Sequence, residues 1–321
     1  MAFKPPTPTP PGLWRRTPPA IFPPVMGLFG LGLAWRRAAQ EFAVPPGVGE
    51  AMLGATVLLF VFSLLAYGTK AARRPAAVTE DLRVLPGRAG LAALAMCLHL
   101  LVLTITPYAP HRAAVLLWVG LALHATLIAA VLRGFARGPA EQRRVTPVWH
   151  LTFVGPIVAA LAAAGLGQER LALALFAATG LAAAAIWGAS LAQFVRETVP
   201  APLRPLLAIH LAPAALLGMT AAALGMPGLA AGFAALAAVM LAALTVSALW
   251  LTRAGFSPLW GAFTFPLAAT ASLWLVLGGV WRLPGGLALV AATLIVPPIA
   301  LKVMQSWAKG QLAAKTNASV A

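Results

Sequence analysis

Four histidines lie inside long apolar stretches of this chain, where few other side chains can take part in chemistry. They are His99, His124, His150 and His210. A buried imidazole can ligate a metal or a haem, relay a proton, or form hydrogen bonds in a packed interface or a polar wall. The sequence has no metal-binding cluster of His and Cys, no nucleophile motif and no phosphate-binding loop. We therefore interpret the histidines as packing or lining residues, and we predict no bound metal and no cofactor.

Acidic side chains are almost absent from the same apolar stretches. Six of the seven acidic residues fall in connections, and Glu50 lies in the first turn of an apolar stretch. A proton-driven transporter needs an acid or a His relay within the membrane, and an intramembrane hydrolase needs a carboxylate, a metal or an activated nucleophile. The sequence therefore disfavours an enzyme or a haem protein. It also disfavours proton coupling, unless His99 or His210 supplies the relay.

Prolines interrupt four of the apolar stretches. They are Pro24 (next to Pro23), Pro156, Pro213 and Pro266, and the last three are nearly evenly spaced. A proline inside a helix removes a backbone hydrogen bond and costs about 3 kcal/mol. In lipid, the freed carbonyl must face protein or a wet cavity. Regular spacing indicates a repeated unit. The prolines therefore predict repeated, kinked helices that surround a cavity.

The composition places these helices in a membrane. Of the 321 residues, 61% are hydrophobic and 9% are charged, compared with about 25% charged residues in a soluble domain. The mean hydropathy is +0.88. Spans of roughly 20 apolar residues predict transmembrane helices. We predict ten: Ala20–Trp35, Val48–Thr69, Ala89–Thr106, Ala113–Leu132, Val145–Gly165, Leu171–Phe194, Pro205–Leu224, Gly228–Leu251, Leu259–Leu277 and Gly286–Met304.

Connection lengths group the ten predicted spans into five hairpins, since short connections join antiparallel neighbours. All four proline sites fall in first members of hairpins, whereas the third span lacks such a proline and carries His99. We therefore expect an inner ring of five kinked odd-numbered helices inside five straighter ones. His99 and His210 lie at middle depth on odd-numbered spans and are candidate lining residues.

Charge distribution predicts the orientation. Most of the 23 Lys and Arg residues fall on the side of both termini, and the remainder are Arg36, Arg37, Arg112, Arg170 and Arg282. The positive-inside rule places both termini in the cytoplasm. The net charge of +16 is then mainly a topology signal, so no nucleic-acid partner is predicted. We expect a cytoplasmic proline-rich tail over residues 1–18 without a cleavable signal peptide, a transmembrane domain over 19–307, and a cytoplasmic tail over 308–321.

Several short motifs resemble those of the bacterial tellurite-resistance/dicarboxylate transporter family, to which the plant guard-cell slow anion channels are related. The resemblance covers the chain from about Pro19 to Trp307. The motifs that carry it are Gly27–Trp35, Thr146–Trp149 with Val154–Pro156, Pro205–Pro213 and Phe256–Pro266.

The resemblance implies an all-α integral membrane protein with ten transmembrane helices as five hairpins. It implies quasi-fivefold symmetry, odd-numbered helices that line a central pore, and homotrimers with one pore per subunit. In the family an aromatic side chain from the ninth helix plugs the pore, and the matching position is Phe265, beside Pro266. Phe263 is the other aromatic candidate in the same motif. Side chains two positions apart on a helix point about 160° from each other. Only one of the two can face the axis.

Two functions follow. The first is a channel or channel-like transporter that passes small inorganic anions, because few charges line the spans and permeation requires weak sites. The alternative is a secondary transporter of C4-dicarboxylates or tellurite-related oxyanions. In either case the predicted location is the bacterial inner membrane, with the lipid bilayer and small anions or organic dianions as partners.

Overall fold

A computed structural model describes residues 12–321, and every regular element within that part of the chain is helical. Residues 1–11 of the predicted N-terminal tail lie outside the described residues. The longer helices are α1 (Phe22–Glu41), α2 (Gly47–Arg73), α4 (Leu85–Ile105), α5 (Pro110–Arg137), α7 (Glu169–Arg196), α9 (Pro227–Val246) and α12 (Arg282–Ala308). The shorter α-helices are α3 (Ala76–Arg83), α6 (Ile157–Gly165), α8 (Leu211–Ala223), α10 (Ala248–Leu251), α11 (Thr264–Leu277) and α13 (Leu312–Lys315).

Short segments of tighter or wider helix join them. The 3₁₀ segments are η1 (Pro19–Ile21), η2 (Ala140–Arg143), η4 (Ala201–His210), η5 (Pro258–Phe263) and η6 (Gly279–Trp281), and η3 (His150–Val154) is a π-helical turn.

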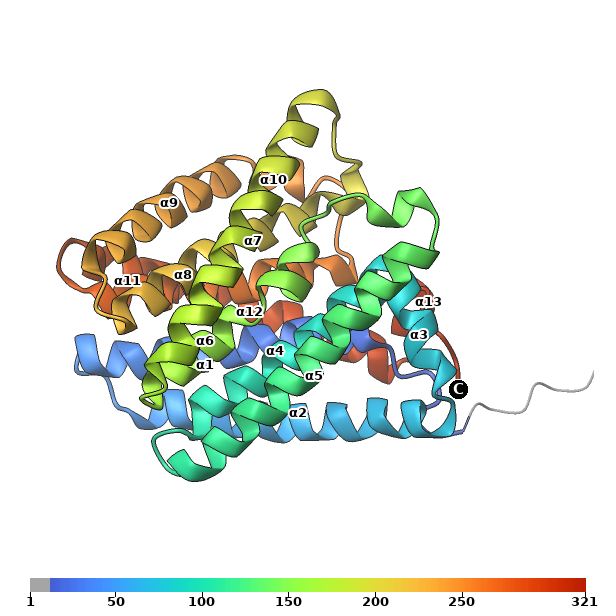
Figure 1. Cartoon of the computed structure of the whole chain (residues 1–321), viewed down its shortest axis with the longest axis horizontal. Helices are drawn as coiled ribbons and strands as arrows, with labels where there is room; N and C mark the ends of the chain where they lie inside the picture. Colours follow the sequence, from blue (N-terminus) through green and yellow to red (C-terminus); the bar gives the residue numbers. More distant parts are fainter. Residues whose placement is uncertain (1–11) are drawn as a thin grey trace, which may run out of the picture.

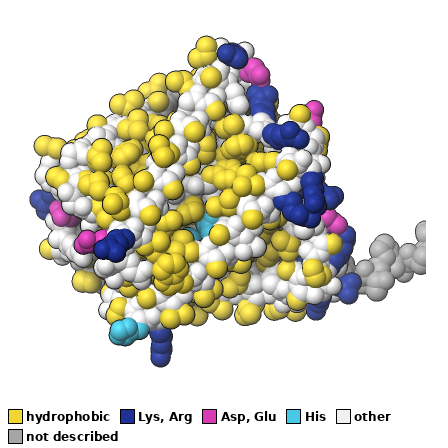
Figure 2. Space-filling view, viewed as in Figure 1, with side chains coloured by type: hydrophobic (Ala, Val, Ile, Leu, Met, Phe, Trp, Pro, Cys, Tyr) yellow, Lys and Arg dark blue, Asp and Glu magenta, His cyan; other side chains and the backbone are white. Residues whose placement is uncertain are grey.

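Eight helices are long and apolar enough to cross a membrane, among the residues that the structure describes. A shorter apolar helix covers His150–Gly165, and α1 is not among the eight. The predicted first span falls on α1, and the predicted fifth span falls on the His150–Gly165 segment. Figure 2 shows a broad hydrophobic face with Lys, Arg, Asp and Glu side chains gathered toward its two ends. The prediction of an all-helical membrane protein is therefore confirmed, with eight candidate spans.

Helices that follow one another in sequence pack together. The contacting pairs are α1–α2, α4–α5, α6–α7, α8–α9 and α11–α12. The first members of these pairs also contact one another in a closed cycle, in the order α1, α4, α6, α8, α11 and back to α1. Figure 1 shows this bundle, with α3, α13 and the C-terminus gathered at one end.

Burial separates the two members of a pair. In the spans that contain α4, α8 and α11, between 67% and 78% of the residues are buried within the protein. In α2, α5, α7, α9 and α12 the share is between 17% and 39%. The first set therefore forms the protein interior, and the second set presents apolar side chains outward.

The four prolines from which kinks are predicted lie at the starts of α-helices instead of within them. Pro24, Pro213 and Pro266 are each the third residue of α1, α8 and α11, and Pro156 directly precedes α6. A proline in the first turn lacks only an N–H that has no partner within the helix, so it avoids the interior cost. Each of these α-helices follows a 3₁₀ or π segment. The breaks predicted from the prolines are therefore changes of helix type.

Candidate functional site

Two cavities lie between the helices of the closed cycle. The first has a volume of about 40 Å³ and is lined by residues of η1, α1, α4, η3, η4, α8, η5 and α11, and by Thr316. We call it the C-terminal cavity. The second has a volume of about 270 Å³, receives residues from α1, α4, α6, α8 and α11, and includes Arg36 and Arg37 in its wall. We call it the arginine cavity.

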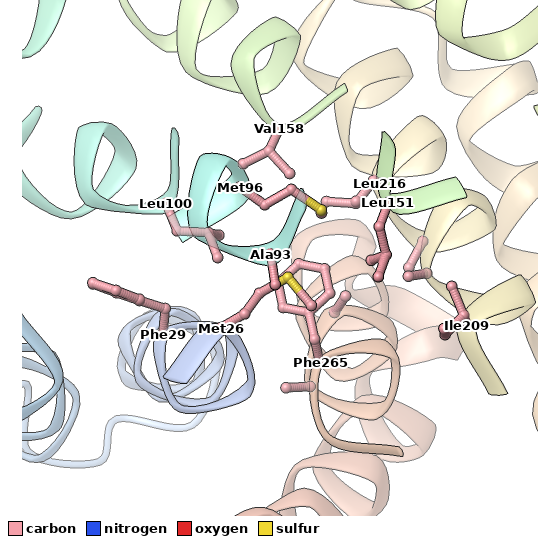
Figure 3. Packing of buried hydrophobic residues seen from close by; sticks show 14 of the residues in the cluster. Met26, Phe29, Ala93, Met96, Leu100, Leu151, Val158, Ile209, Leu216 and Phe265 are labelled. Carbon is pink, nitrogen blue, oxygen red and sulfur yellow. The ribbon is translucent and has the colours of Figure 1, made fainter. Parts of the chain in front are cut away.

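Phe265 lies between the two cavities. It is the one residue, among those that the structure describes, that lines both. Its side chain is only 2% exposed. Figure 3 shows the ring pointing from α11 toward Met26 of α1 and Ala93 of α4, with Leu151 and Leu216 on another side. An aromatic side chain therefore separates the two cavities.

Two glycines of α1 make room for the start of α11. A Cβ added at Gly27 would lie 2.3 Å from Oγ1 of Thr264, and one at Gly30 would lie 2.9 Å from Cδ2 of Phe265. Real Cβ atoms do not approach that closely, so only glycine lets the two helices pack at this distance. Gly30 therefore fixes the space that the Phe265 ring occupies.

The other aromatic of the motif lies elsewhere. Phe263 packs edge-on against Trp260, with ring centroids 5.7 Å apart, and lines neither cavity. Pro266 lines the C-terminal cavity, as does Pro23, the neighbour of Pro24. Pro156 and Pro213 line neither cavity and act only through the helix starts described above.

The cavity walls differ in charge. No charged residue lines the C-terminal cavity, and no Asp or Glu lines either cavity, within residues 12–321. The arginine cavity carries Arg36 and Arg37 together with the polar side chains Gln40, Thr106 and Ser272. The C-terminal cavity is therefore neutral, and the arginine cavity is positive.

Arg36 is held by an ion pair. Its Nε and Nη2 donate to the two carboxylate oxygens of Glu50 at 2.7 and 2.8 Å, and its remaining donors reach the carbonyls of Leu103 and Thr104 at 3.3 and 3.2 Å. A bidentate Arg–carboxylate pair is geometrically specific. Arg36 therefore ties α1 to the start of α2 and the end of α4.

The histidines form two pairs. His99 and His124 stack with ring centroids 5.5 Å apart, and His124 Nε2 lies 2.9 Å from the carbonyl oxygen of Thr152. His150 Nε2 lies 2.9 Å from His210 Nδ1. His210 faces a third, lateral cavity, and none of the four lines the C-terminal or the arginine cavity. A lining role for His99 or His210 stays a prediction. No group of three or more potential metal ligands occurs within the described part of the chain.

Sequence reasoning missed two residues of the site, Gly30 and Arg37. The signal for Gly30 was the glycine pair in Gly27–Trp35, which lies on one face of a helix at three-residue spacing. The distribution of Lys and Arg identifies Arg37 only as a charge that sets the membrane orientation. Its position at the cavity wall depends on helix rotation, which hydropathy does not specify.

One comparison with known proteins identifies relatives. A family model described as "SLAC1: Voltage-dependent anion channel" matches residues 16–304. A search of curated proteins finds no match.

Proposed function

Because the chain belongs to the SLAC1 family of voltage-dependent anion channels, we propose that it passes small inorganic anions through the conduit enclosed by α1, α4, α6, α8 and α11. The single observation that carries the proposal is the line of two cavities, interrupted by Phe265, along the shared interior of those helices. Walls without acidic side chains favour anions, and the scarcity of charge keeps binding weak enough for conduction.

In this proposal ten helical segments cross the bilayer as five hairpins with quasi-fivefold symmetry. The eight apolar helices, α1 and the His150–Gly165 segment would together make up the ten. The pairwise packing of consecutive helices and the closed cycle of first members support this arrangement. A homotrimer in the bacterial inner membrane, with both termini cytoplasmic, stays a prediction from the resemblance and from the Lys and Arg distribution.

Phe265 is the proposed gate. Its ring is almost fully buried and lines the cavities on both of its sides, so the path cannot be continuous while the ring keeps this position. Opening would require the ring to move away from Met26 and Ala93. Pro266, one residue along in the first turn of α11, limits the backbone conformations available there.

The test is an anion-current measurement on reconstituted protein. Phe265→Ala should raise the chloride current by about tenfold or more, because removing a barrier of only about 1.4 kcal/mol already gives a tenfold change. Phe263→Ala is the matched control, since it removes the neighbouring ring that lines neither cavity. Equal currents from wild type, Phe265→Ala and Phe263→Ala would contradict a phenylalanine gate.

The alternative is a coupled carrier of C4-dicarboxylates or tellurite-related oxyanions. The arginine cavity, at about 270 Å³, can enclose a small organic dianion, which is the observation in its favour. No acidic side chain of the described residues lines either cavity, and this argues against proton coupling. Dianion uptake that requires a pH gradient would favour the carrier. Current that follows the anion gradient alone would favour the channel. No enzymatic activity is proposed.

A further inference from the structure

We propose that Arg37 is the anion-recruiting residue of the conduit, and that its neighbour Arg36 is not. The inference rests on the proposed function and assigns the entrance of that path. It makes the arginine cavity a weak binding site for small anions, where Arg37 supplies the charge and the hydroxyl of Ser272 supplies a hydrogen-bond donor.

Charge pairing distinguishes the two arginines. Arg36 is neutralised by Glu50 and uses its donors on Glu50 and two backbone carbonyls. Arg37 occurs in none of the ion pairs formed among residues 12–321. Its single hydrogen bond is a long one, 3.4 Å from Nη1 to the neutral Gln40 Oε1. The Arg37 guanidinium therefore keeps its net charge and free donors.

The surroundings do not cancel that charge. The acidic residue next in sequence, Glu41, lies beside another cation, with 4.0 Å between its carboxylate and the Arg282 guanidinium. No Asp or Glu of the described chain lines the cavity. A positive group at the mouth of a cavity with apolar walls raises the local concentration of anions. The C-terminal cavity has no corresponding charge, so the recruitment is confined to one end of the conduit.

The position of Arg37 also matches an entrance. It is an exposed residue on α1, two turns beyond Gly30, which contacts Phe265. Both Gly30 and Arg37 line the same cavity. An anion drawn to Arg37 therefore enters the space that ends at the Phe265 ring. Ser272, on α11, is a buried residue, 5% exposed, whose side chain lines the same cavity.

The experiment compares Arg37→Gln with Arg37→Lys in the Phe265→Ala background, in bilayers of zwitterionic lipid so that anionic headgroups do not compete. Arg37→Gln should reduce the chloride current about threefold to tenfold at 0.01 M salt, and Arg37→Lys should not. At 1 M salt the loss should be less than about twofold, because the Debye length falls from about 30 Å to about 3 Å. Arg112→Gln is the matched control, since Arg112 is an exposed arginine outside the cavity wall.

Ion valence gives a second readout that a merely structural defect would not produce. The energy of an ion in a potential is proportional to its charge, so a threefold loss for chloride corresponds to about ninefold for sulfate. Equal fractional losses for the two ions, or equal losses in Arg37→Gln and Arg37→Lys, would overturn the assignment. Unchanged currents in Arg37→Gln beside a conducting Phe265→Ala parent would also overturn it and leave the proposed function standing. A parent without any anion current would overturn both.

Discussion

At the level of single residues, one contact between α1 and α11 lies at the boundary between the two cavities. Gly30 leaves the space for the Phe265 ring, and the ring lies between the two cavities. The two residues are far apart in the sequence, so their pairing is a property of the folded protein. A single carbon atom added at Gly30 should therefore disturb the packing of the Phe265 ring.

Gly30→Ala should lower stability by about 1–3 kcal/mol, because its Cβ would lie 2.9 Å from Phe265 Cδ2 and 3.3 Å from the Cβ of Ala268. In Phe265→Ala the ring is gone, and most of that cost should disappear. Thermal unfolding of the four detergent-solubilised proteins measures this coupling as a double-mutant cycle. Gly54→Ala is the control, since an added Cβ there has no atom within 4 Å. An additive pair of substitutions would show that Gly30 does not hold the ring.

At the level of elements, the starts of α1, α4, α8 and α11 and the C-terminal segment that contains Thr316 line the C-terminal cavity. A change from 3₁₀ or π helix to α-helix accompanies each of the four prolines, and such changes in helix type often mark functional positions. The C-terminal segment lies at the opposite end from Arg37. Thr316 is 3% exposed and lines the C-terminal cavity, and Leu312 is fully buried.

A buried ionic cluster holds that segment. Asp81 of α3 forms an ion pair with Lys70 of α2 at 2.8 Å, and both side chains are fully buried. Asp81 also accepts hydrogen bonds from the Tyr67 hydroxyl at 3.0 Å and from the Ser319 backbone N–H at 2.8 Å. One carboxylate therefore connects α2, α3 and the C-terminal segment.

Asp81→Asn should destabilise the protein by about 3–5 kcal/mol, because it leaves the Lys70 charge buried without a partner. It should also speed tryptic cleavage at Lys309 and Lys315, since the anchor of Ser319 is weakened. Unfolding and limited proteolysis measure the two effects. Glu80→Gln is the matched control on the same helix: its ion pair with Arg74 is about 40% exposed on both sides and is worth at most about 1 kcal/mol. Similar behaviour of the two variants would contradict the role of the cluster.

At the level of the whole molecule, the apolar face and the charged ends determine how the protein lies in a bilayer (Figure 2). Outward-facing apolar side chains on α2, α5, α7, α9 and α12 match lipid, while the buried first members enclose the cavities. The orientation follows from the Lys and Arg count, which predicts that the turn before α5 and the end of α12 lie on opposite sides of the membrane.

Cysteine labelling tests that orientation. The one native cysteine, Cys97, is fully buried and should not react. His111→Cys and Lys309→Cys each place a thiol at an exposed position. A membrane-impermeant maleimide added to intact cells should label His111→Cys and leave Lys309→Cys unlabelled until the membrane is permeabilised. Labelling of both variants in intact cells would contradict the predicted topology.

The amino-acid sequence alone determined the class of the protein. Hydropathy, charge placement and proline spacing are local properties, so the sequence sufficed to predict an all-helical membrane protein, and the motifs from Gly27 to Pro266 sufficed for the family, which the family match confirms. The motif favours Phe265 over Phe263, and in the structure Phe265 lines both cavities whereas Phe263 lines neither.

Only the tertiary structure decided which residues surround the two cavities. The histidines pair between helices instead of lining the two cavities, the prolines begin α-helices, and Arg37 and Gly30 reach the cavity wall. The physical reason is that a side chain's exposure to a cavity depends on helix rotation and on contacts between segments distant in sequence. Packing fixes those contacts. Nearly uniform apolar helices carry little periodic signal in their sequence that would reveal which face packs inward.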